Sequence, residues 1–162
     1  MYRIKQFIWA INSIFSKVDY KLIDKYLDTQ EKDVFLKLSK SEQCHSIRVC
    51  KDCLDNIDEN IDEKVMAKIA LLHDLGKINY KLNIFEKSIF IIIKKIFNID
   101  YKKVSYAKVR NYYNHSKESV RILEKLNKEY SDEFYDAIRN HHSDNFMKNK
   151  YLTLLKNADD RN

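Results

Sequence analysis

The sequence predicts an all-α domain, and three observations support that prediction. Its 162 residues include no proline and a single glycine, Gly76. β-Sandwiches and barrels need many tight turns that use these two residue types, and a doubly wound α/β fold needs a glycine-rich phosphate-binding turn. Hydrophobic residues make up 44% of the chain, which is enough to form a core. Finally, apolar residues recur at helical spacing along most of the sequence.

The first forty residues are expected to form three helices. The first carries a stripe of apolar residues at the spacing of an amphipathic helix, namely Ile4, Phe7, Ile8, Ile11 and Phe15. A second helix is expected to begin after Asp19, a good N-cap residue, and to run to about Leu27. A third should extend from about Glu31 to Leu38. We expect residues 1–40 to be accessory helices packed on a core at residues 41–160, all within a single domain of residues 1–162.

The next two helices contain the first polar residues of interest. Ser41 is expected to cap a helix that holds His45 and continues through Leu54. A strongly apolar helix follows from Val65, and Gly76 should end it as a left-handed C-cap residue.

The rest of the chain also follows a helical pattern. Five further segments are expected, at residues 85–97, 101–113, 115–126, 132–141 and 148–158. No internal repeat, linker or change of composition divides the sequence, which favours one domain.

The charge, the apolar runs and the cysteines of the sequence indicate which partners and which cellular location to expect. The net charge of +6 suits anionic partners, but a Lys-, Ile- and Asn-rich composition explains it better without any partner, and we expect no stable nucleic-acid partner. The most apolar run, residues 89–93, is far too short to span a membrane. Cys50 and Cys53 form an isolated C-x-x-C pair, which at helical spacing is best interpreted as two small core residues. Free thiols favour a reducing, cytoplasmic location.

The five histidines form the most informative pattern. Each lies near the start or end of an expected apolar helix, and they are His45, His73, His115, His141 and His142. Asp74 follows His73 directly, and Asp159 follows the last apolar turn. Imidazole and carboxylate are preferred ligands of divalent transition metals, and helical bundles build metal sites from side chains on facing helices. The pattern therefore predicts a metal site.

In this order, H…HD…H…HH…D, the residues resemble the HD superfamily of metal-dependent phosphohydrolases. The segment ALLHDLGK, a leucine-rich helix leading into His-Asp and then x-Gly-Lys, is the most specific part. The resemblance covers about residues 41–160. It implies an HD-domain-like helical bundle, here with additional N-terminal helices.

The resemblance also implies a ligand set. The four ligands shared by the superfamily correspond to His45, His73, Asp74 and Asp159, and the additional ligands of two-metal members correspond to His115 and one or both of His141 and His142. Asp74 would then bridge the ions, and the usual Ala-Asp order favours Asp159 over Asp160. The expected cofactor is one or two ions of Fe, Mn, Ni, Co or Zn, whereas Mg is less suited to histidine-rich ligation. No Gly-Tyr-Pro segment follows the His141-His142 pair, so the subgroup of cyclic-di-GMP phosphodiesterases is not indicated.

Three functions remain open at this point. The first is hydrolysis of a nucleotide or another small phosphate ester, with Asp74 and Lys77 as catalytic residues and Lys77 holding a phosphate oxygen as a point charge. An ordinary exposed lysine is an equally good interpretation of Lys77. The second is a di-iron oxygenase on the same fold, and the third is a non-catalytic sensor of a metal or nucleotide. Because the sequence ends at Asn162, the last ligand is expected to lie in a frayed turn or to be completed by a neighbouring subunit of a homodimer.

Overall fold

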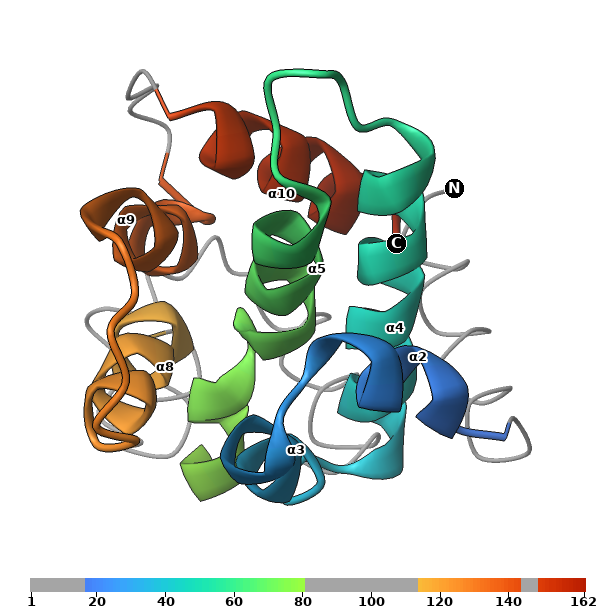
Figure 1. Cartoon of the computed structure of the whole chain (residues 1–162). Helices are drawn as coiled ribbons and strands as arrows, with labels where there is room; N and C mark the ends of the chain where they lie inside the picture. The colour runs from blue at the N-terminus through green and yellow to red at the C-terminus, as the bar shows by residue number, and fades with distance from the viewer. Residues whose placement is uncertain (1–16, 81–113, 144–148) are drawn as a thin grey trace, which may run out of the picture.

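A computed structural model describes residues 17–80, 114–143 and 149–162 of the chain. Within these ranges it contains seven α-helices, one 3₁₀ helix and no strand, which confirms the all-α prediction (Figure 1). The elements are α2 (Tyr20–Tyr26), α3 (Thr29–Phe35), α4 (Lys40–Asp55), α5 (Glu63–Leu72), the 3₁₀ helix η1 (Leu75–Tyr80), α8 (His115–Glu124), α9 (Asp132–Asn140) and α10 (Lys150–Arg161). The helices expected at residues 4–15, 85–97 and 101–113 lie outside the described residues.

The starts of α2 and α4 test two of the predicted N-cap residues. Asp19 caps α2 as predicted, because its side chain accepts a hydrogen bond from the backbone N–H of Leu22. The predicted cap of α4 is wrong by two residues, since Ser39 rather than Ser41 accepts from the N–H of Glu42. Either serine is a suitable cap by type, so residue type alone does not distinguish them.

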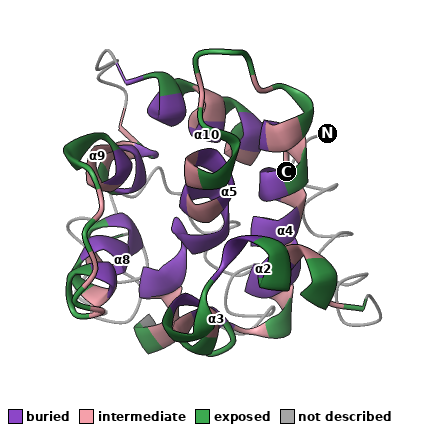
Figure 2. Ribbon diagram, viewed as in Figure 1, coloured by how far each residue is buried: buried purple, intermediate pink, exposed green. Residues whose placement is uncertain are grey.

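Helix α5 lies at the centre of the fold, between α4 on one side and α9 on the other, and α10 packs against all three (Figures 1 and 2). Six of its ten residues are buried, and they are Met66, Ala67, Ile69, Ala70, Leu71 and Leu72, whereas Glu63 and Lys64 at its start are exposed. The second half of the helix is therefore enclosed by the protein. Its last turn therefore delivers the next two residues, His73 and Asp74, to the interior, where they are 0% and 1% exposed.

Gly76 does not act as the predicted left-handed C-cap. No glycine in the described residues has a positive φ, and the chain passes from α5 through a right-handed His73 into η1. Gly76 is needed for close packing instead, because a Cβ atom there would lie 2.1 Å from the carbonyl oxygen of His115. Its N–H donates to Ser119 Oγ at 2.8 Å, and that hydroxyl lies 2.7 Å from the carbonyl oxygen of His73. This contact joins η1 to α8.

The described part of the N-terminal region packs on the same core through a buried carboxylate. Glu31 of α3 is 0% exposed, and both of its oxygens contact the Lys68 ammonium of α5, at 2.6 and 2.7 Å. The hydroxyl of Tyr130 also donates to Glu31, at 2.8 Å, and the N–H of Asp28 donates at 2.9 Å in a capping box. One side chain thus links α3, α5 and the segment before α9.

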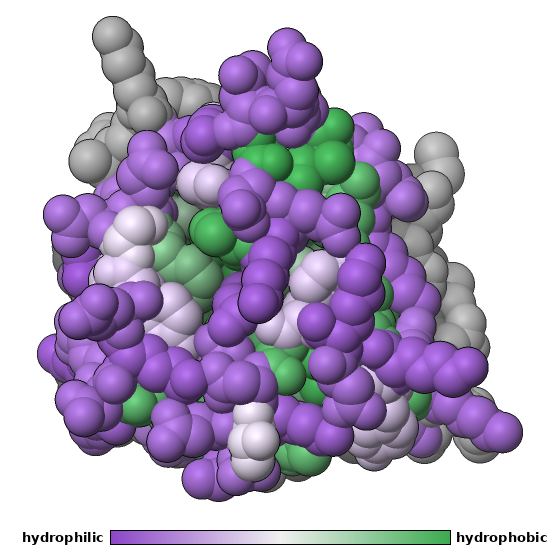
Figure 3. All heavy atoms as spheres, in the orientation of Figure 1, coloured by the Kyte–Doolittle hydropathy of each residue, from purple (hydrophilic) through white to green (hydrophobic). Residues whose placement is uncertain are grey.

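The cysteines are free and buried, as expected of core residues. Burial raises the pKa of Cys50 to about 12 and raises that of Cys53 as well, so neither thiol is activated. None of the helices among the described residues is long and apolar enough to cross a membrane. The face of the molecule in Figure 3 is mostly hydrophilic, with apolar side chains showing in small areas.

Candidate metal centre

The seven residues implied as ligands come together from five segments of the chain. They are His45 in α4, His73 and Asp74 after α5, His115 at the start of α8, His141 and His142 after α9, and Asp159 in the last turn of α10. Most of them lie at helix ends, where a side chain can reach past its own helix towards a neighbour. Their nitrogen and oxygen atoms form three groups of three: two triads with no residue in common, and a third group, made of His73, Asp74 and His141, that joins them.

The first triad consists of His45, His73 and Asp159, whose ligand atoms lie within 4.8 Å of one another. Oδ1 of Asp159 is 3.0 Å from His45 Nε2 and 3.8 Å from His73 Nε2. Burial by itself would raise the pKa of Asp159, but the contact with His45 outweighs it and holds the pKa below its usual range. The triad therefore offers one carboxylate and two imidazoles.

The second triad consists of His115, His141 and His142, whose ligand atoms also lie within 4.8 Å of one another. The Nε2 atoms of His115 and His142 are 3.1 Å apart. Three imidazoles at this separation form a donor set that suits a borderline transition metal. His142 is the exposed member of the triad, with half of its side-chain surface accessible.

Asp74 lies between the triads and turns one oxygen towards each. Its Oδ2 atom is 3.4 Å from His73 Nε2 and 3.7 Å from His45 Nε2. Its Oδ1 atom is 2.9 Å from His115 Nε2 and 4.0 Å from His141 Nε2. A carboxylate placed in this way can contact two cations with a different oxygen each.

Backbone hydrogen bonds fix the tautomers of the two most deeply buried rings. His73 donates from Nδ1 to the carbonyl of Ala70 at 2.8 Å, and His141 donates in the same way to Ile138 at 2.7 Å. Because a carbonyl only accepts, the proton of each neutral ring must sit on Nδ1, which leaves a lone pair on Nε2. Both Nε2 atoms are buried and have no hydrogen-bond partner among the described residues. An unsatisfied buried acceptor costs about 1–3 kcal/mol, and a metal ion would satisfy it. The donor set therefore fits a divalent metal.

Burial favours the neutral form of three histidines, His73, His141 and His142, while its neighbours keep Asp74 charged, and these are the forms that bind metals. Burial lowers the pKa of His73, lowers that of His141 well below its usual value, and together with His115 lowers that of His142 to about 4. Burial alone would raise the pKa of Asp74. His73, the ammonium of Lys77 and the hydrogen bond from His115 outweigh this effect and hold the pKa of Asp74 well below its usual range.

Lys77 is not an exposed surface lysine. Its side chain is 12% exposed, and Nζ lies 2.5 Å from Asp74 Oδ2 and 3.5 Å from Glu42 Oε2. Sequence reasoning missed Glu42, a buried residue of α4. Glu42 could have been found from its position three residues before His45, because this spacing puts both side chains on one face of a helix.

Asp159, the last candidate ligand, lies in a regular turn of α10. Helix α10 continues to Arg161, whose guanidinium pairs with both oxygens of Asp52 in α4, at 2.8 and 3.0 Å. Asp159 reaches His45 of the same chain, so the expected frayed turn is not observed and this contact needs no second subunit. Asp160 is exposed and belongs to neither triad.

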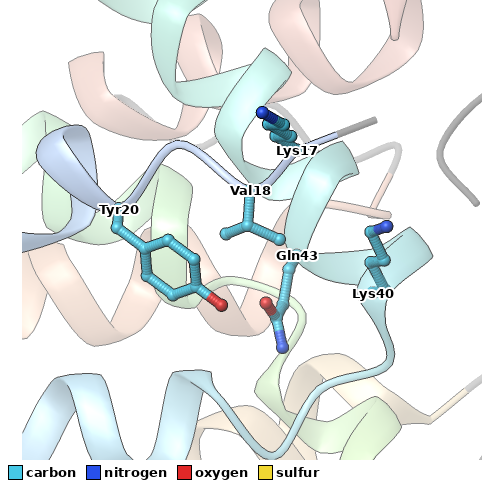
Figure 4. A pocket seen from close by; sticks show the side chains of 5 residues that line it. All are labelled: Lys17, Val18, Tyr20, Lys40 and Gln43. Atoms are coloured by element: carbon cyan, nitrogen blue, oxygen red, sulfur yellow. The ribbon is translucent and has the colours of Figure 1, made fainter. Parts of the chain in front are cut away.

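A nearby cavity is distinct from the cluster. It has a volume of about 470 Å³ and lies between the segment before α2 and the first turns of α4. In Figure 4 the side chains of Tyr20 and Gln43 extend into the same space, beside Lys40. Among the described residues, no histidine or carboxylate lines this cavity, so it is not part of the candidate metal centre.

Comparison with known proteins gives one match. A family model described as the HD domain matches residues 43–161, a range that includes all seven clustered residues and Lys77. Neither the curated proteins nor the solved structures contain a match to the chain.

Proposed function

Because this chain belongs to the HD domain family, whose members are generally metal-dependent hydrolases, we propose that it is a phosphohydrolase acting on a nucleotide or another small phosphate ester. The observation that carries the proposal is the position of Asp74, with one oxygen towards each triad and the Lys77 ammonium beside it. A phosphate ester is an anion with several oxygens, and a site that combines metal ions with a fixed ammonium is suited to it.

In this proposal the first triad would hold one ion, the second triad would hold another, and Asp74 would supply a ligand to each. The imidazole-rich donor set favours Fe, Mn, Co, Ni or Zn over Mg. Ions bound here supply Lewis acidity, which neutralises phosphoryl oxygens and makes water a nucleophile at neutral pH.

The protein's own groups prepare this chemistry. The carbonyls of Ala70 and Ile138 orient the two buried rings, so the ligands need little reorganisation. The Lys77 ammonium provides the charge that would contact a non-bridging phosphate oxygen. Because His142 is half exposed, the second triad is open to solvent, and a small substrate would approach from its side. The buried free thiols suit a reducing compartment, so we place the protein in the cytoplasm.

The test is a metal analysis combined with a panel of phosphate esters. The protein should contain one or two transition-metal ions per chain and should hydrolyse at least one of p-nitrophenyl phosphate, bis(p-nitrophenyl) phosphate or the common nucleotides. A chelator should abolish turnover. Asp159→Asn should also abolish it, whereas the matched control Asp160→Asn, which changes an exposed neighbour, should not.

Two results would overturn the proposal in favour of the alternative functions. Iron with substrate-dependent oxygen uptake would indicate an oxygenase. Stable metal binding with no turnover of any ester in the presence of Mn, Co or Ni would indicate a sensor.

A further inference from the structure

Glu42, Lys77 and Asp74 form a row in which one ammonium lies between two buried carboxylates. Glu42 and Asp74 are 7% and 1% exposed. The Lys77 ammonium is 2.5 Å from Asp74 and 3.5 Å from Glu42. The three residues come from α4, from the end of α5 and from η1, so the row exists only in the folded protein.

The oxygen of Asp74 that contacts Lys77 is the one that faces the first triad. Oδ2 is 3.4 Å from His73 Nε2 and 3.7 Å from His45 Nε2, while Oδ1 faces the second triad. A cation held by the first triad and Asp74 Oδ2 would therefore lie close to the Lys77 ammonium. Two positive charges that share one oxygen repel each other strongly in a buried site.

We propose that the Lys77 ammonium and the first metal ion compete for Asp74 Oδ2, and that Glu42 is the positioning residue that holds Lys77 when the metal is bound. This inference rests on the proposed metal binding. In the metal-free protein Lys77 neutralises Asp74. When the ion binds, the ammonium moves towards Glu42 and stays beside the site, where it can meet a phosphate oxygen.

The location of Glu42 fits this role. Its carboxylate is buried, so it needs a positive partner in either state. It lies on the same helix as His45, one turn away, so the residue that receives the ammonium is rigidly connected to a ligand of the first triad. Without Glu42 the contact with Asp74 would become more favourable for Lys77, and the ammonium would compete more strongly with the metal.

The experiment is a titration of the full chain, in its metal-free form, with Co²⁺. Isothermal calorimetry gives the affinity, and the visible absorption of bound Co²⁺ reports its ligand environment. Lys77→Gln should bind the first ion more tightly and Glu42→Gln more weakly, each by about tenfold, within the range seen for contacting charged groups. In the double variant the effect of Glu42→Gln should disappear, because no ammonium remains to be held.

Two matched variants test whether the loss of affinity is specific to the charge of Glu42. Glu63→Gln removes an exposed carboxylate that also contacts a lysine, ten residues before His73 on α5, and should leave the Co²⁺ affinity unchanged. Glu42→Asp keeps the charge and should restore most of the affinity, which guards against loss of folding in Glu42→Gln. Circular dichroism of each variant checks the fold.

Three results would overturn the inference, each for a different reason. A Glu42→Gln protein with wild-type affinity would show that Glu42 has no role in metal binding. A loss of affinity that persists in the Lys77→Gln background would show that Glu42 attracts the ion directly. A wild-type protein that binds no Co²⁺, Mn²⁺ or Zn²⁺ would instead remove the proposed function, and this inference with it.

Discussion

The buried carboxylate of Glu31 is expected to be a major contributor to stability, and Glu31→Gln measures it. The carboxylate accepts from three donors, namely the Lys68 ammonium, the Tyr130 hydroxyl and the N–H of Asp28. A glutamine would turn its own N–H₂ group towards one of these donors and would leave Lys68 without a charged acceptor. Removing one partner of a buried ion pair costs about 3–5 kcal/mol. Because the Lys68 side chain is 19% exposed, we expect the lower end, ~3 kcal/mol.

Urea unfolding followed by circular dichroism at 222 nm provides the measurement, since the described fold is helical. The matched control is Asp24→Asn, which breaks an exposed pair with Lys32 and should cost less than about 1 kcal/mol. The double variant Glu31→Gln, Lys68→Met should recover part of the loss, because no unpaired charge remains. A free energy of unfolding within about 1 kcal/mol of the wild type in Glu31→Gln would refute this account of how α3 is held.

Four further results are expected. His115→Ala should lose one ion of two by elemental analysis, and retention of both would remove His115 from the second triad. Gly76→Ala should lower the free energy of unfolding by about 3 kcal/mol in urea titration, because its Cβ would meet the His115 carbonyl at 2.1 Å. Lys77→Ala should keep the metal stoichiometry but slow turnover by about 10²-fold in steady-state kinetics if the phosphate contact tightens in the transition state. Metal-free protein should lose stability as the pH falls from 6.5 towards 4. The fold lowers the pKa of His142 to about 4 and lowers that of His141 well below its usual value, so the unfolded chain binds protons at these histidines before the folded chain does. Urea titrations at pH 7 and 4.5 with a chelator test this sign.

The helical fold and the candidate metal ligands could be predicted from the sequence, because both depend on residue types and their periodic arrangement. The histidines could be found because each lies near the start or end of an expected apolar helix, and the helical content follows from the lack of turn residues. The cap of α4 could not be located, because Ser39 and Ser41 are equivalent by type. Gly76 was misinterpreted for a related reason, since a glycine after a helix usually marks a left-handed cap, whereas here it allows close contact with a helix 39 residues later.

Long-range polar contacts were the least predictable part of the site. The pairs of Lys77 with Glu42 and of Arg161 with Asp52 join segments far apart in the chain, and surface-type residues such as Glu, Lys and Arg give no sign of burial in a sequence. A lysine just after a helix can equally be exposed. Its contact with Asp74, three residues earlier, depends on the 3₁₀ turn in which the chain continues after α5.

The same close contact that requires Gly76 also sets the separation of the two triads. Ser119 Oγ accepts from the Gly76 N–H and lies within hydrogen-bond distance of the His73 carbonyl and of the His115 carbonyl, at 2.7 and 3.0 Å. One hydroxyl therefore ties His73, the first-triad residue that follows α5, to His115, the second-triad residue that begins α8. Asp74 lies between them, and its span from one oxygen to the other is fixed by covalent geometry. The two triads can share Asp74 only while this backbone contact holds, so the lone glycine of the chain is a structural requirement of the proposed two-metal site.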